Sequence, residues 1–153
     1  MSFKRILVAV DGSETGGLAL NEAILLAKNA KAALRIIHVE DEYHIGLADV
    51  PFDYRDALIK EIKKEGIALL AKVKAIAVNS GLPDVETKLA ELKQHGQRVS
   101  EIIAEEAKHW SADLLVLGTH GRRGISHLFL GSVAEHVARI SPVPVLLVRP
   151  IRS

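Results

Sequence analysis

Short runs of apolar residues alternate along this chain with longer segments in which apolar residues recur at helical spacing. Residues 6–10 are all apolar and precede Asp11, Gly12 and Ser13, a pattern typical of a strand buried on both faces and then a turn. Over residues 14–30 leucines and alanines recur near every third or fourth position, and Ser13 stands where a helix N-cap is needed. The chain is therefore expected to open with a strand, a turn and a helix.

The same alternation continues to the end of the chain. Strands alternating with helices predict an α/β fold, in which a mainly parallel sheet of five strands carries helices on both faces. The expected strand order is 3-2-1-4-5, the open three-layer α/β/α arrangement of Rossmann-like nucleotide-binding folds, with residues 1–153 as one domain. The further strands are expected over residues 34–39, 85–92, 113–118 and 143–148, and the further helices after Pro51 as far as Ser80, around residues 99–107 and over residues 132–140.

The longest expected helix contains one glycine, Gly66, which is expected to weaken the helix locally. Apolar residues at helical spacing are expected to form the face that this helix packs on the sheet. The expected stripe consists of Leu58, Ile62, Leu69, Val73 and Ile76.

The last expected strand begins with Val143, ends with Val148 and contains or adjoins two prolines, Pro142 and Pro144. Proline cannot donate to a central ladder, so this strand is placed at an edge of the sheet. An apolar edge exposes unpaired backbone groups, and a homodimer formed through residues 143–148 is therefore expected. The alternative is that the two prolines alone protect the edge.

Composition narrows the range of partners. Apolar residues make up 48% of the chain and charged residues 25%, and the formal net charge is +1, which is too balanced to indicate a nucleic-acid or membrane partner. The chain has no cysteine, which excludes disulfides, thiol chemistry and cysteine-bound zinc and fits a cytoplasmic protein. The apolar run at residues 6–10 is too short for a signal peptide, and no other run approaches a membrane span.

A glycine-bearing loop follows the fourth expected strand. Gly118 and Gly121 are separated by two residues, and nine residues later Gly131 and Ser132 stand at the start of a helix. Glycines let the backbone approach an anion closely, and a helix N-terminus offers unpaired N–H groups, so residues 118–132 are candidates for holding phosphate. The alternative is that these glycines only form turns and start the helix. The first and fourth strands are neighbours at the switch point of the expected topology, where ligands of such sheets bind, and this favours a binding site.

The chain resembles the ATP-binding branch of the universal stress protein family over nearly its whole length. The resemblance rests on the motif Gly-x-x-Gly-(nine residues)-Gly-Ser at Gly118, Gly121, Gly131 and Ser132, and on the opening residues 6–13, the strand segment 112–118 and the closing residues 142–148. Members without these glycines form a branch that does not bind ATP. The resemblance therefore implies an ATP-binding stress-response module, and it also implies dimers in which the last strands of two subunits pair.

The resemblance also implies which residues contact the nucleotide. The main chain of Val39 is implied to hydrogen-bond the adenine edge, and an aspartate at Asp11 is implied to contact the nucleotide. The full implied set is Ala9, Val10, Asp11, Val39, Gly118, Thr119, Gly121, Arg122, Gly131, Ser132 and Val133.

Asp11 is the candidate metal ligand. Mg²⁺ is commonly held by one or two carboxylates together with substrate phosphates, so Asp11 would bind Mg²⁺ or Mn²⁺, or else the ribose. The alternative is that Asp11 caps the following turn, and the two roles can coexist. The basic side chains of the loop, His120, Arg122, Arg123 and His127, would complement phosphate charge or would simply be solvated.

Several other chemistries lack their motifs. The chain has no Gly-x-Gly-x-x-Gly after the first strand, no Gly-Lys-Ser/Thr, no His-Glu-x-x-His and no Gly-x-Ser-x-Gly. His38, inside a strand, is expected to be a packed histidine. Three functions remain: a nucleotide-binding regulatory module, which is favoured; a slow Mg-dependent ATPase or nucleotide-dependent transferase using Asp11 and His120; and an interaction protein with vestigial glycines.

Overall fold

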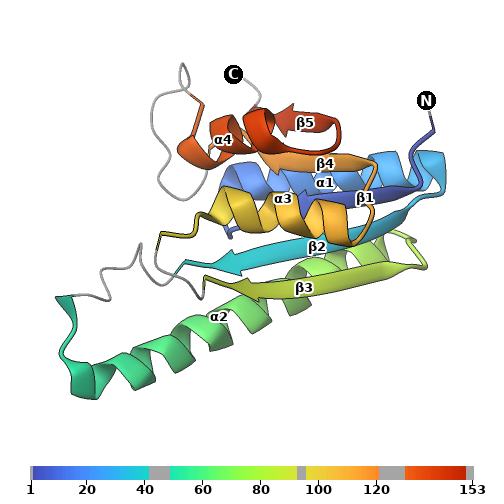
Figure 1. Cartoon of the computed structure of the whole chain (residues 1–153). Coiled ribbons are helices and arrows are strands. Elements are labelled where there is room, and N and C mark those ends of the chain that lie inside the picture. Colours follow the sequence, from blue (N-terminus) through green and yellow to red (C-terminus); the bar gives the residue numbers. More distant parts are fainter. Residues whose placement is uncertain (1, 42–48, 93–95, 121–129, 151–153) are drawn as a thin grey trace.

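The computed structural model describes residues 2–41, 49–92, 96–120 and 130–150 (Figure 1). Helices and strands alternate through these residues, as the sequence predicts. In chain order the elements are β1 Arg5–Ala9, α1 Glu14–Ala30, β2 Ala33–Glu40, α2 Phe52–Asn79, β3 Val85–Glu91, α3 Val99–His109, β4 Leu114–Gly118, α4 Ser132–Ile140 and β5 Val145–Val148.

The five strands form one parallel sheet in the order β3-β2-β1-β4-β5, which confirms the predicted order. Val8 in the middle of β1 pairs with Ile36 of β2 on one side and with Val116 of β4 on the other. The central strands are buried on both faces because helices cover both, and for this reason they appear in the sequence as unbroken apolar runs. β5 lies at the edge of the sheet, as its prolines predict, although it begins at Val145 rather than at Val143.

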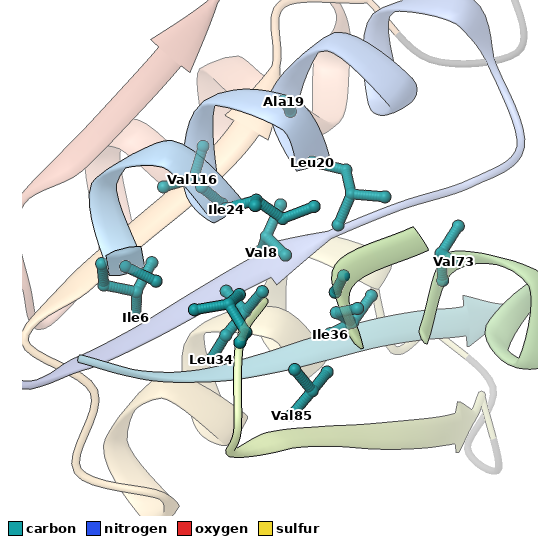
Figure 2. Packing of buried hydrophobic residues seen from close by; sticks show 14 of the residues in the cluster. Ile6, Val8, Ala19, Leu20, Ile24, Leu34, Ile36, Val73, Val85 and Val116 are labelled. Atoms are coloured by element: carbon teal, nitrogen blue, oxygen red, sulfur yellow. The ribbon is translucent and has the colours of Figure 1, made fainter. Parts of the chain in front are cut away.

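Helices α1 and α2 cover one face of the sheet. The close view in Figure 2 shows Leu20 and Ile24 of α1 over Val8 of β1. On the α2 side, Val73 belongs to the same cluster, together with Ile36 of β2. The opposite face carries α3 and α4, whose core cluster includes Leu7, Ile37, Leu115, Ile103 and Val137.

The buried face of α2 differs from the predicted stripe. Leu69 is partly buried and packs against the core cluster, as predicted. Ile76 is 40% exposed, so the predicted stripe is wrong at this position. Its neighbour Ala77 is fully buried instead. The buried residues of α2 are Ile62, Gly66, Leu70, Val73 and Ala77.

The first turns of α2 extend beyond the carboxyl ends of β2 and β3 (Figure 1). Phe52 is 82% exposed and Tyr54 is 66% exposed, so the helix is anchored through its later turns. In the described part of the chain, no helix is both long and apolar enough to span a bilayer.

Three helices end with the same backbone motif at the amino edge of the sheet. Lys31, Gly81 and Ser111 follow the ends of α1, α2 and α3 and have positive φ angles of 55°, 102° and 60°. In each case the next residue donates its N–H to a carbonyl five residues back, for example Ala112 N to Ala107 O at 2.8 Å. Glycine suits this left-handed position best, yet only α2 has glycine there.

Candidate functional site

A cavity of about 460 Å³ opens at the carboxyl edge of the sheet, where β1 and β4 are neighbours. Its volume lies in the range of pockets that hold small molecules. The ends of β1, β2 and β4 line it together with residues of α2, α3 and α4. The cavity therefore lies at the topological switch point, where the sequence predicts a ligand.

Most of the predicted contact residues meet at this cavity. Gly121 and Arg122, like Arg123 and His127, lie outside the described residues. The predicted residues that line the cavity are Ala9, Val10, Asp11, Val39, Gly118, Thr119, Gly131, Ser132 and Val133.

Asp11 organises the turn between β1 and α1. Its Oδ1 accepts a hydrogen bond from the Ser13 amide at 2.9 Å, and Ser13 Oγ in turn accepts from the Gly16 amide at 3.1 Å. The second bond is the N-cap of α1, which confirms the predicted role of Ser13. The alternative role of Asp11, capping the turn, is therefore realised, and its carboxylate is held at the cavity wall.

Val39 lies in the part of β2 that extends beyond the end of its neighbour β1. Alternate residues of a parallel strand turn their N–H and C=O groups to opposite neighbours, so Ile37 and Val39 both turn theirs toward β1. Ile37 O accepts from Val10 N at 2.9 Å, whereas the pairing of β1 with β2 ends at Ile37. The main chain of Val39 therefore faces the cavity side without a strand opposite it.

Gly118 ends β4 where α1 comes very close. A Cβ atom at this position would lie 2.9 Å from the carbonyl oxygen of Thr15. The Thr15 hydroxyl also donates to the carbonyl of His120. Glycine at this position is therefore required by the close packing of α1 on the end of β4.

Thr119 and Gly131 join the end of β4 to the start of α4. Gly131 donates its N–H to Thr119 O at 2.7 Å, and the N-cap of α4 makes no side-chain hydrogen bond. The amides in the first turn of a helix have no acceptors within the helix. At the cavity these are the amides of Ser132 and Val133, with the positive end of the helix dipole behind them.

His120 adds an imidazole to this end of the cavity. The ring is half-buried, and its Nδ1 lies 3.0 Å from the Thr119 hydroxyl. The hydrogen bond fixes the orientation of the ring beside Gly118. A neutral or protonated imidazole here can donate a hydrogen bond to an anion.

Helix α2 supplies a wall that the motif does not reveal. His38 is buried, as predicted, and its Nδ1 donates to Val10 O at 2.9 Å. A Cβ on Gly66 would lie 3.2 Å from His38 Cδ2 and 3.3 Å from Glu40 Oε1, so glycine allows α2 to pack against these side chains. His38, Glu40 and Gly66 all line the cavity. The signal for this wall in the sequence is the glycine in the middle of a long helix.

A polar contact fixes α4 against α3. Arg98 Nη1 donates to His136 Nε2 at 3.3 Å, so the opposite nitrogen, Nδ1, carries the hydrogen and donates to Ser100 Oγ at 2.5 Å. Ser100 is buried, and its neighbour Val99 lines the cavity. The contact therefore holds the first turns of both helices beside the cavity, and no local pattern in the sequence indicates it.

The described residues contain no group of three or more side chains that could hold a metal by themselves. Asp11 offers one carboxylate at the cavity wall, close to the start of α1. This donor set does not fit a metal held by the protein alone. It fits Mg²⁺, which keeps most of its ligands as water and phosphate oxygens.

A family model described as the universal stress protein family matches residues 2–149. The chain belongs to the universal stress protein family. Universal stress protein YxiE of Bacillus subtilis is 37% identical over 153 residues, which cover 96% of this chain and 99% of that protein. The resemblance carried by the glycine motif is thereby confirmed at the level of the family.

Solved structures agree with the fold. Hypothetical protein MJ0577, described as a test case for assigning biochemical function from structure, matches this universal stress protein with a TM-score of 0.83 and 25% identity, covering 100% of both chains. A universal stress protein solved in complex with cAMP matches with a TM-score of 0.67 and 26% identity over 97% of this chain and 98% of that one. An adenine nucleotide is therefore bound by at least one structurally similar protein.

Proposed function

We propose that this universal stress protein binds an adenine nucleotide, with ATP as its ligand, and that occupancy of the site regulates the protein. The observation that carries the proposal is the cavity at the switch point, where Asp11, the Gly118 end of β4 and the uncapped start of α4 converge. The cAMP complex of a protein 26% identical to this one supports the choice of an adenine nucleotide.

The proposed orientation follows from the two ends of the cavity. Adenine lies against the apolar side chains near β2 and α3 and hydrogen-bonds the main chain of Val39, which has no partner on the β1 side because the pairing of β1 with β2 ends at Ile37. The phosphates lie at Gly118 and accept from the amides of Ser132 and Val133 at the start of α4. Gly121 and Arg122, outside the described residues, are proposed to complete the phosphate contacts. Asp11 holds Mg²⁺ against the phosphates.

Binding without dedicated turnover is the favoured form of this function. Asp11 already serves the turn through its bond to the Ser13 amide, and the proposed donors to phosphate are the main-chain amides of Ser132 and Val133. The second candidate is a slow Mg-dependent ATPase or transferase. It is favoured by one observation, the His120 imidazole held at the same end of the cavity.

The decisive experiment measures nucleotide binding and phosphate release on the same samples. Mass analysis identifies any copurified nucleotide, and calorimetry with ATP and Mg²⁺ measures affinity. The wild-type protein is expected to bind ATP, and Asp11→Ala is expected to weaken Mg-dependent binding by about tenfold or more, because one charged ligand is lost. Ser13→Ala is the matched control, since it loosens the same turn but keeps the carboxylate.

The outcomes separate the candidates. Failure to bind ATP with Mg²⁺ at millimolar concentration contradicts both nucleotide functions and leaves an interaction protein. Binding with phosphate release that disappears in Asp11→Ala favours the ATPase. ATP binding without Asp11-dependent phosphate release supports the regulatory module.

We also propose that the protein is a homodimer through β5. This strand lies at the edge of the sheet, and its Leu146 is exposed on the α1 face. An apolar edge strand of this kind is a template for pairing with another chain.

A further inference from the structure

A second hollow, of about 350 Å³, lies at the amino edge of the sheet, at the opposite end from the nucleotide cavity. It is shallow and mainly polar. Its described walls are Arg5 at the start of β1, Arg35 in β2, and His109, Trp110 and Ser111 at the end of α3. All five side chains carry hydrogen-bond donors and none carries a carboxylate, so the hollow suits a ligand that accepts hydrogen bonds.

Arg5 is held in a fixed orientation. Its guanidinium lies 4.4 Å from the centre of the Trp110 ring, and its Nε donates to Trp110 O at 2.8 Å. These two contacts use the face and the inner edge of the guanidinium. The side chain is exposed and forms no ion pair with any residue that the structure describes. Asp113 is the nearby carboxylate, and its two oxygens accept from the main-chain N–H groups of Lys4 and Arg5 at 2.7 and 3.0 Å. The outer N–H fork of Arg5 therefore forms no side-chain ion pair with a described residue and has a geometry that matches an oxyanion.

Arg35 differs from Arg5 because its charge is already paired. Its Nη1 donates to Glu106 at 2.6 Å and its Nη2 to Glu86 at 2.5 Å. Burial lowers the pKa of Arg35, but the bonds to Glu86 and Glu106 outweigh this effect and raise the pKa above its ordinary value. Arg35 therefore stays charged at every pH of interest and forms a fixed support under Trp110, 4.8 Å from the ring centre.

Two donors in this support have no acceptor among the described residues. They are Arg35 Nε and Trp110 Nε1, and both are buried. A buried donor without an acceptor is costly, and such groups in folded proteins call for an explanation. Both side chains belong to the walls of the hollow, so the local excess of donors over acceptors extends below its surface.

Ser111 is a second unusual feature of the same hollow. It occupies the left-handed position after α3, with φ of 60°, where glycine is favoured. The serine adds a hydroxyl to the wall that Arg5 also lines, at the expense of backbone stability. The C-terminal end of α3 is the negative end of the helix dipole, which opposes an anion, but Lys108 and His109 in its last turn offset that effect.

We propose that this hollow binds a phosphate or carboxylate group, with the Arg5 guanidinium as its charged ligand and the Ser111 hydroxyl as a second donor. The site is separate from the nucleotide cavity, since the two share no lining residue. Its ligand is a small oxyanion, or the anionic group of a larger metabolite, that reaches the protein at the amino edge of the sheet.

Trp110 makes the proposal directly measurable because it is the only tryptophan of the chain. Its ring contacts the Arg5 guanidinium, so the tryptophan fluorescence of the protein comes entirely from this hollow. The full chain is titrated with sodium phosphate, with sodium acetate and with sodium chloride at matched ionic strength. Phosphate is expected to change the emission with half-saturation on the order of millimolar, as suits one unpaired guanidinium at a shallow site. Acetate distinguishes a carboxylate preference from a phosphate preference.

Two variants and one matched control test the assignment. Arg5→Gln is expected to weaken the response about tenfold or more, because a bidentate charge-assisted contact is lost. Lys4→Gln removes a neighbouring exposed charge that does not line the hollow and is expected to leave the response unchanged. Ser111→Gly is expected to raise the melting temperature, since glycine relieves the left-handed position, while it weakens the phosphate response.

The results divide cleanly. A saturable response to phosphate or acetate that Arg5→Gln loses and Lys4→Gln retains supports the site. A response no larger than that to chloride overturns the proposal, and so does an equal response in Arg5→Gln. If Ser111→Gly gains stability but keeps full affinity, Ser111 is no ligand and the assignment of its hydroxyl is wrong. None of these readings depends on ATP binding, so they stand or fall apart from the proposed function.

Discussion

At the scale of single residues, three glycines of this chain have different physical roles. Gly118 is enclosed by Thr15, whose backbone oxygen would lie 2.9 Å from an added Cβ. Gly66 is enclosed by side chains, with Leu89 Cδ1 at 2.9 Å. Gly17, in α1, has no atom within 4 Å of an added Cβ. Only the first of these positions is blocked by backbone, which cannot move without moving a helix.

Substitution by alanine is therefore expected to change stability in opposite directions at two of these positions. Gly118→Ala forces α1 away from β4 and is expected to destabilise the protein by about 1–3 kcal/mol, as overpacked sites do. Gly17→Ala, the matched control in open space, is expected to stabilise it by about 0.5–1 kcal/mol through helix propensity. Urea unfolding measures both free energies. A neutral Gly118→Ala would show that the loop and α1 can separate without cost.

At the scale of elements, the shared ending of three helices isolates the contribution of backbone conformation. Lys31 and Gly81 occupy the same left-handed position after α1 and α2, yet only Gly81 has the residue that this position favours. Nothing lies within 4 Å of a Cβ added to Gly81. Differences between the two positions therefore arise from the backbone and from the unfolded chain, with no clash involved.

Reciprocal substitutions test this. Lys31→Gly is expected to stabilise the protein by about 0.5–1 kcal/mol, and Gly81→Ala is expected to destabilise it by about 1 kcal/mol. Thermal and urea unfolding give both values. The same sign for the two substitutions would contradict the account and would indicate that Lys31 makes a side-chain interaction that outweighs its backbone cost.

The elements themselves could be predicted well because the sheet is buried on both faces. Strands such as β4 appear as unbroken apolar runs that end in glycine, and their alternation with helices implies the parallel order. The face of α2 was predicted less well. Helical spacing alone does not distinguish Leu69 from Leu70, or Ile76 from the buried Ala77. That choice depends on how the helix is rotated on the sheet, and adjacent apolar residues leave this rotation open.

At the scale of the whole molecule, the same distinction applies to the site. Residues at strand ends could be predicted, because the strand order fixes where the ends of β1 and β4 meet. The α2 wall with His38 and Glu40, and the contact between Ser100 and His136, could not be predicted, because they join segments far apart in the sequence. These residues are determined by packing rather than by spacing.

The proposed dimer can be tested by a substitution in the edge strand β5. Leu146→Lys places a charge on the exposed face of the edge strand and is expected to weaken self-association about tenfold or more, because the lysine must lose water on pairing. Ile67→Lys, on the exposed face of α2, is the matched control. Light scattering after size exclusion measures the mass. A monomeric wild-type protein, or an equally dimeric Leu146→Lys, would contradict the proposed dimer.

The main chain of Thr119 forms hydrogen bonds to two segments with different proposed roles. Its N–H donates to Val148 O at 3.0 Å at the end of the edge strand, and its C=O accepts from Gly131 at the start of α4. One peptide segment thus stands between the strand proposed to meet a second subunit and the helix end proposed to meet phosphate. If both proposals hold and one binding event displaces Thr119, linkage requires that the nucleotide and the second subunit change each other's affinity by the same factor. Self-association would then depend on ATP concentration, and ATP affinity would depend on protein concentration.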